Sequence, residues 1–231
     1  MTRYRLVLWD VDGTLVHCGG AGRRSLERAL REECRAPQGD LSALRLDGRT
    51  DRSIIRLGMA LLGGSFSDEA CDRVLARYLE ALPEELAGPE FRVLPGAVEA
   101  LRALRAGGVA YGLCTGNVAE GARFKLRRGE LEAYFEWGPG AVAGFAGDGE
   151  VRTRLVEAAL RRAGARLGRI DPAEVVVVGD TPLDVEAAHG AGCAALGVAT
   201  GRHGAGDLAA SGADHVVESL SAPAALLLLA G

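Results

Sequence analysis

The stretch LVLWDVDGTLV, residues 6–16, joins an apolar run directly to two carboxylates and a glycine. We interpret residues 4–9 as a β-strand, so that Asp10 and Asp12 stand where the strand ends and the backbone turns at Gly13. Carboxylates in this position can bind a metal ion, transfer protons, or simply end a strand. Other features of the sequence are needed to distinguish these roles.

A second stretch, VVVVGDTPLD at residues 175–184, repeats the arrangement. Four consecutive valines are typical of a strand buried on both faces of a parallel sheet. Further apolar runs predict strands at residues 109–114, 141–145, 194–198 and 215–217. Helical patterns lie between them near residues 97–105, 118–128, 153–163 and 183–191. This alternation predicts an α/β fold with a doubly wound parallel sheet.

The interval from about residue 18 to residue 91 contains no convincing strand. Apolar residues recur there at helical spacing, first from Ile54 to Leu61 and again from Ala70 to Leu82. The turn-prone segments HCGGAG and AGPEFRVLPG flank the interval and suit hinges. We therefore expect residues 1–17 and 92–231 to form the α/β core, and residues 18–91 to form a helical insertion.

The composition excludes several classes of protein. The 231 residues are 48% apolar and 25% charged with a net charge of −4, so the chain predicts a packed core and no nucleic-acid-binding surface. Five cysteines at irregular spacing fit reduced thiols. No apolar run has the length of a membrane span, and we expect a cytoplasmic protein without membrane contact. Lys125 is the single lysine among 27 basic residues, which we attribute to a general arginine bias.

Polar residues follow three of the predicted strands. Asp10 follows the first, Thr115 in LCTGN follows the second, and Asp180 follows the four valines. Ligands of open parallel sheets bind outside the carboxyl ends of the strands, so we expect these three residues to share one site. A calcium-binding EF-hand loop is the alternative for the first stretch, but its twelfth position would be Ala21 rather than glutamate.

DVDGT, TGN and GDTPLD resemble the first, second and fourth motifs of the haloacid dehalogenase superfamily, specifically of its phosphatases. The resemblance spans the chain, and the helical insertion takes the place of the small cap that many members carry. It implies that Asp10 is the nucleophile and Asp12 the general acid/base. It also implies that Asp10, Asp180 and the backbone carbonyl of Asp12 hold Mg²⁺.

The residue types suit this chemistry independently. Carboxylates repel a dianionic phosphate ester, and a bound Mg²⁺ would neutralise both. A covalent aspartyl-phosphate splits a slow hydrolysis into two steps, and a second carboxylate can supply and remove the proton. Thr115, Gly116 and Asn117 precede a predicted helix, whose free N–H groups favour an anion. We assign Asp184 to a supporting role, either beside the metal or as a helix cap.

The third motif departs from the family, whose phosphatases usually carry a lysine after the third strand. The segment GFAGDGEVRTRLVEAALRRAG has none, and Arg152 is the nearest cation in register, followed by Arg154. We expect the Arg152 charge to replace the lysine at the phosphoryl group, although the two side chains differ in geometry. Lys125 lies ten residues after Thr115, about 15 Å along a helix, which predicts that it is too distant to help.

In the cap, the segment LDGRTDRSI resembles one that faces the active site in relatives. Arg49 is therefore a candidate substrate contact, while Thr50 or Asp51 is expected to cap the following helix. The predicted function is hydrolysis of a small organic phosphate such as phosphoglycolate, by a monomer or weak homodimer. A sugar-phosphate mutase of the same superfamily and a non-catalytic module that binds phosphate ligands are the alternatives.

Overall fold

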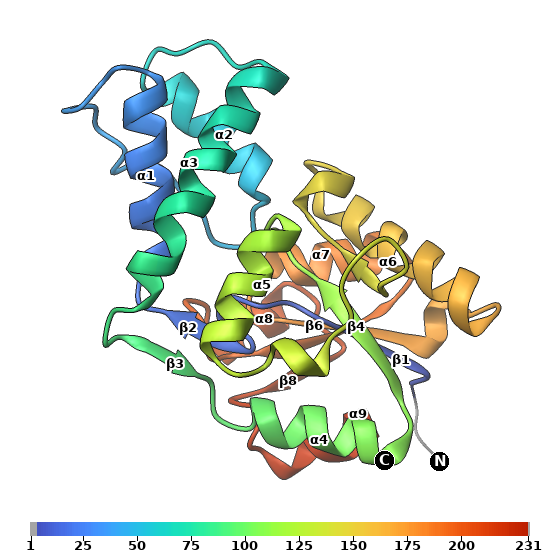
Figure 1. Cartoon of the computed structure of the whole chain (residues 1–231). Helices are drawn as coiled ribbons and strands as arrows, with labels where there is room; N and C mark the ends of the chain where they lie inside the picture. The colour runs from blue at the N-terminus through green and yellow to red at the C-terminus, as the bar shows by residue number, and fades with distance from the viewer. Residues whose placement is uncertain (1–3, 231) are drawn as a thin grey trace.

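The computed structural model describes residues 4–230, and Figure 1 shows a central sheet with helices around it. Six parallel strands lie in the order β5-β4-β1-β6-β7-β8. Their bounds are Leu6–Trp9 (β1), Ala110–Cys114 (β4), Ala143–Gly144 (β5), Val175–Gly179 (β6), Ala194–Val198 (β7) and His215–Val217 (β8). The predicted doubly wound α/β fold is confirmed, since every neighbouring pair in this sheet is parallel.

Helices cover both faces of the sheet, which is why its central strands are apolar without alternation. Val7 and Trp9 face a cluster formed with α4 (Ala97–Gly107), α5 (Ala119–Arg128) and α9 (Pro223–Ala230). Leu6 and Leu8 face the opposite cluster with α6 (Arg152–Leu167) and α7 (Pro182–Gly190). The remaining core helix, α8 (Ala205–Ala210), packs against β7 and β8. Short 3₁₀ turns lie at Glu132–Tyr134, Ala146–Asp148 and Pro172–Glu174.

The insertion is helical and has its own apolar core. It contains α1 (Ala21–Glu33), α2 (Asp51–Leu61) and α3 (Asp68–Leu86), which stand apart from the sheet in Figure 1. Leu30, Ile55 and Tyr78 are among the buried residues of a cluster shared by the three helices. Most of α1–α3 therefore packs on itself rather than on the α/β core.

Two short strands connect the helical insertion to the core, and the sequence analysis missed both. β2 (Val16–Cys18) and β3 (Phe91–Val93) pair antiparallel, with His17 opposite Arg92. Each has three residues, too few to show an alternating pattern, and the partners are more than 70 residues apart in the chain. The two chain segments that connect the α/β core to the insertion therefore form one two-stranded ribbon.

The predicted core strands all exist, with ends that differ by one or two residues. The predictions for residues 194–198 and 215–217 match β7 and β8, whereas the strand predicted at 141–145 is reduced to Ala143–Gly144. Helices α1, α8 and α9 were not predicted individually. None of the helices within residues 4–230 combines the length and apolar character needed to cross a membrane.

Candidate active site

The order β4-β1-β6 brings the carboxyl ends of three strands together. Thr115 follows β4, Asp10 follows β1 and Asp180 follows β6, and all three residues line one cavity of about 450 Å³. The cavity continues between the sheet and the helical insertion, where Arg23 and Leu46 line it. The structure thus brings together the three strand-end residues that the sequence singled out.

Three carboxylates form a buried cluster, of which Asp10 and Asp180 line this cavity. Asp10, Asp180 and Asp184 each present an oxygen, and these atoms lie within 4.8 Å of one another. Burial raises the pKa of Asp10 to about 6, although Arg152 opposes the shift. Burial, reinforced by Asp184 and Asp10, raises the pKa of Asp180 well above its usual value. Ionised carboxylates at this density need a further positive charge.

Two glycines lie so close to the Asp180 carboxylate that neither position has room for a side chain. A Cβ atom on Gly13 would stand 2.3 Å from Asp180 Oδ2, and one on Gly201 would stand 1.7 Å from it. Gly13 also has a positive φ of 81°, which side-chain-bearing residues rarely adopt. Both glycines are therefore required by the close approach of the Asp180 carboxylate, and Gly201 was not recognised from the sequence.

Arg152, the first residue of α6, lies buried among these carboxylates. Its Nη2 is 3.1 Å from Asp10 Oδ1 and makes a second, short ion pair with Asp184 Oδ1. Its Nη1 donates a hydrogen bond to the Gly48 carbonyl oxygen of the insertion at 3.2 Å. The neighbouring carboxylates outweigh burial and raise the pKa of Arg152 further. Arg154, by contrast, is exposed and pairs with Glu157 at 2.8 Å.

Asp184 supports the cluster from the start of α7. Thr181 and Asp184 form a capping box, in which the Thr181 hydroxyl accepts from Asp184 N at 3.3 Å. The same hydroxyl donates to Asp184 Oδ2 at 2.7 Å. The backbone N–H of Thr181 donates to the same oxygen at 3.1 Å. The other oxygen faces Arg152. Both Asp184 oxygens thus have protein partners, and Pro182 occupies the first turn of the helix, where proline is well tolerated.

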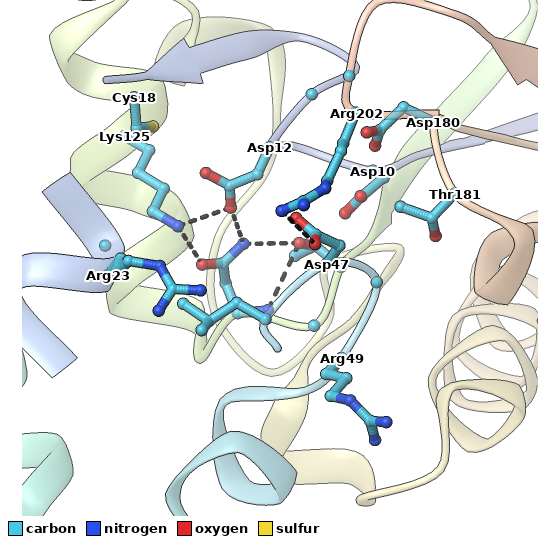
Figure 2. Close-up of a pocket in the computed structure, with 18 of the residues that line it drawn as sticks. Asp10, Asp12, Cys18, Arg23, Asp47, Arg49, Lys125, Asp180, Thr181 and Arg202 are labelled. Carbon is cyan, nitrogen blue, oxygen red and sulfur yellow. Dashed lines mark hydrogen bonds and ion pairs between the residues drawn. The ribbon is translucent and has the colours of Figure 1, made fainter. Parts of the chain in front are cut away.

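Asp12 faces a second cation, and this is a correction to the sequence analysis. Lys125 Nζ lies 2.6 Å from Asp12 Oδ2 and 2.5 Å from Asn117 Oδ1 (Figure 2). The prediction that Lys125 is too distant was wrong because α5 begins only at Ala119. In addition, helical side chains lean toward the N-terminus of their helix, which shortens the reach to the site. Removal of water from around Asp12 opposes its ionisation. The Lys125 ammonium outweighs this effect and lowers the pKa of Asp12 below its usual value.

The TGN segment is shaped by contact with the insertion. The Asn117 side chain donates to Asp12 Oδ2 and to Thr115 Oγ1, each at 2.8 Å. At Gly116, a Cβ atom would stand 2.1 Å from the Arg49 carbonyl oxygen. Asp51 N donates to the Gly116 carbonyl oxygen at 2.7 Å. Only glycine allows the insertion to approach this closely.

Asp51 completes this contact and was expected only as a candidate helix cap. The cap of α2 is Thr50, whose hydroxyl accepts from Ser53 N at 3.3 Å. The Asp51 carboxylate instead accepts from Val118 N at 2.7 Å, at the start of α5. Burial raises the pKa of Asp51 to about 6.

Arginines from both the α/β core and the insertion line the cavity. Arg202, after β7, lies 3.7 Å from Asp47 of the insertion. Arg23, in α1, donates to the Leu44 carbonyl oxygen at 2.8 Å and to Glu27 at 2.9 Å. Arg49 also lines the cavity, but Figure 2 shows its guanidinium directed away from Asp10 and Asp180.

A divalent cation fits the cluster better than further protein groups do. Asp10 and Asp180 offer oxygen donors, which Mg²⁺ prefers, and the Arg152 guanidinium contacts two of the three carboxylates, Asp10 and Asp184. The carboxyl ends of the strands are where α/β proteins with an open parallel sheet bind their ligands, and the cluster lies at such an edge. The matching family model is the haloacid dehalogenase-like hydrolase, over residues 4–192, and the chain belongs to this family.

Characterised relatives confirm the resemblance to the phosphatases of this family. A phosphoglycolate phosphatase of Rhodospirillum rubrum is 32% identical over 81% of this chain and 76% of its own length. Phosphoglycolate phosphatase 1 of Pseudomonas aeruginosa is 31% identical over 83% of this chain and 69% of its own. The interpretation as a phosphatase enzyme rests on these similarities together with the family.

Solved structures support the fold. A predicted phosphoglycolate phosphatase from Haemophilus somnus superposes with a TM-score of 0.69, 22% identity and 96% of each chain covered. CbbY from Rhodobacter sphaeroides, in complex with xylulose-(1,5)bisphosphate, superposes with a TM-score of 0.73 and 18% identity, over 96% of this chain and 99% of its own. At these identities the likeness concerns the fold alone.

Proposed function

We propose that the protein is a Mg²⁺-dependent phosphatase that hydrolyses small organic phosphate monoesters through a phosphorylated Asp10. The observation that carries this proposal is the buried cluster of Asp10, Asp180 and Asp184 with Arg152 against it. Asp10 and Asp180, together with the Asp12 carbonyl, would hold Mg²⁺, which neutralises charge between the carboxylates and a dianionic ester.

Asp10 would act as the nucleophile. Its carboxylate oxygen attacks phosphorus, a bond to phosphorus forms, and the bond to the leaving alkoxide breaks. Asp12 in its protonated form gives the alkoxide its proton, and in the ionised form, which Lys125 favours, it takes a proton from the water that hydrolyses the aspartyl-phosphate. Arg152, 3.1 Å from Asp10 Oδ1, would hold phosphoryl oxygens in the transition state. The Thr115 hydroxyl and the backbone at Gly116 and Asn117 would bind the same oxygens.

Residues 18–91 would serve as the cap that closes over the leaving group. Their helices have a separate core, and contacts such as that of Arg152 with the Gly48 carbonyl oxygen join them to the α/β core. We assign the substrate to small phosphate esters of the phosphoglycolate type, on the strength of the two named bacterial relatives. Arg49 remains a proposed substrate contact that requires its guanidinium to turn toward Asp10 and Asp180.

The test is a screen of phosphate monoesters, with 2-phosphoglycolate and p-nitrophenyl phosphate included, in Mg²⁺ and in EDTA. We expect release of inorganic phosphate that EDTA abolishes and Mg²⁺ restores. Transfer of the phosphoryl group within a sugar phosphate, without release, would favour the mutase. Full activity in EDTA would reject the proposal, as would a folded protein that binds no Mg²⁺ and hydrolyses none of the esters.

A further inference from the structure

Lys125 is a cation that the proposed chemistry leaves without a role. It is the single lysine of the chain, its side chain is 5% exposed, and it lines the same cavity as Asp10. Its ammonium lies 2.6 Å from Asp12 Oδ2, while Arg152 contacts Asp10. The two buried cations thus contact different carboxylates. Arg152 contacts the proposed nucleophile, and Lys125 contacts the residue proposed to transfer the proton.

The contact between Lys125 and Asp12 belongs to a closed set of hydrogen bonds. Lys125 donates to Asn117 Oδ1 at 2.5 Å, which turns the Asn117 amide nitrogen toward Asp12 and Thr115. That nitrogen then donates to Asp12 Oδ2 and to Thr115 Oγ1, each at 2.8 Å. One oxygen of Asp12 therefore receives two donors from α5 and the TGN segment, which fixes the plane and direction of the carboxylate.

Asp12 needs such support because its own surroundings are open. Its side chain is 43% exposed to the cavity, and it precedes Gly13, where the backbone turns with a φ of 81°. An aspartate on an open turn has several rotamers within reach. Lys125 belongs to a core helix, so its contact with Asp12 does not depend on where the insertion stands.

The insertion nevertheless comes close to the ammonium. A Cβ atom on Gly22, in α1, would stand 3.5 Å from Lys125 Nζ. The missing side chain at Gly22 leaves the space beside Nζ open to the cavity. A compact ammonium with three donors suits this space, whereas the planar guanidinium found at the other basic positions is larger.

We propose that Lys125 is a positioning residue, which holds the Asp12 carboxylate in the orientation for proton transfer to the leaving oxygen. This inference rests on the proposed phosphatase function. If it is correct, loss of Lys125 harms catalysis mainly through Asp12, and any disturbance of Asn117 and Thr115 lowers kcat/KM on all esters alike. The effect must then grow with the need of the leaving group for a proton.

The experiment compares kcat/KM of Lys125→Met on 2-phosphoglycolate, an alkyl phosphate, and on p-nitrophenyl phosphate. This constant covers every step up to expulsion of the leaving group. We expect a fall of roughly 10- to 100-fold on the alkyl ester, the scale of a misplaced catalytic group, and of less than about threefold on the nitrophenyl ester. In an Asp12→Asn background, Lys125→Met should change the alkyl-ester constant by less than about threefold.

The matched control is Arg127→Met, on the same helix, whose charge pairs with Glu132 at 2.7 Å on the exposed side. It should leave both constants unchanged. Lys125→Gln keeps a hydrogen-bond donor at this position and should recover part of the loss, and it replaces the methionine variant if that variant does not fold. Mg²⁺ affinity, measured by calorimetry, should change by less than about threefold in either variant, because the proposed ligands are intact.

Equal losses on the two esters would overturn the inference, as would additive effects of Lys125→Met and Asp12→Asn. A crystal structure of Lys125→Met with Asp12 unmoved would do the same. These outcomes are distinct from failure of the proposed function, in which the wild-type protein itself would hydrolyse neither ester.

Discussion

Arg152→Ala is the substitution that bears most directly on the departure from the family's usual lysine. It removes a guanidinium that is 7% exposed and that contacts Asp10, Asp184 and the Gly48 carbonyl oxygen. The remaining carboxylates gain little water in exchange, because Asp10 and Asp184 are themselves 4% and 2% exposed. The variant therefore tests both the stability of the cluster and the charge beside the phosphoryl group.

The magnitude follows from this burial. Removal of one partner from a buried ion pair costs about 3–5 kcal/mol of stability. Groups that stabilise the developing charge of a transition state contribute about 10²–10³ in rate. We expect kcat/KM to fall by about that factor in Arg152→Ala. Arg152→Lys should recover part of it, since a lysine keeps the charge but cannot serve two carboxylates and a carbonyl with one planar group.

The assay measures kcat/KM in saturating Mg²⁺ and the free energy of unfolding in urea, with and without Mg²⁺. The loss of stability should be smaller with Mg²⁺, which would replace part of the missing positive charge. Arg154→Ala is the control, because that side chain is 68% exposed and forms a surface ion pair with Glu157. Kinetics close to wild type for Arg152→Ala, or an equal loss for Arg154→Ala, would refute the assignment.

The remaining predictions concern the other carboxylates and one glycine. Asp10→Asn should abolish turnover while the circular dichroism spectrum stays native; measurable turnover would exclude Asp10 as the nucleophile. Asp12→Asn should lower kcat/KM for 2-phosphoglycolate far more than for p-nitrophenyl phosphate, and an equal decrease would argue against a general acid. Burial raises the pKa of Asp51 from 3.8 to about 6, so the stability that its proton provides is fully present below about pH 4 and is lost as the pH rises through 6. Asp51→Asn should flatten this decline, which urea titrations between about pH 4 and pH 7 in EDTA measure; an unchanged slope would contradict the reading. Gly116→Ala would place a Cβ atom 2.1 Å from the Arg49 carbonyl oxygen and should raise KM and lower kcat together, whereas unchanged constants would show that this contact is dispensable.

The sequence predicted the parts of the site that depend on topology. Asp10, Thr115 and Asp180 each follow an apolar strand, and the ends of neighbouring parallel strands meet at one edge of the sheet. Arg152 was placed by its position after the third-motif strand, and the structure locates it against Asp10. The first inference needed only the order of strands and helices, whereas the assignment of Arg152 also needed the resemblance to the family and its third motif.

The parts that were missed depend on distances that no local pattern encodes. Lys125 reaches Asp12 because a long side chain leans back along α5, and spacing along the chain overestimated that distance. Asp51 contacts Val118 only through docking of the insertion on the core. The ribbon of β2 and β3 joins two three-residue segments far apart in the sequence. Each case is a tertiary contact, which determines the site only after the chain has folded.

The central claim is that Asp10 carries the phosphoryl group during turnover. The most direct measurement mixes the protein with Mg²⁺ and 2-phosphoglycolate, quenches in acid within a single turnover, and locates the phosphoryl group by mass spectrometry of the peptides. The account predicts an acyl-phosphate on Asp10 that is absent in EDTA and absent in Asp10→Asn. Rapid hydrolysis with the phosphoryl group on a different residue, or undiminished hydrolysis by Asp10→Asn, would contradict it.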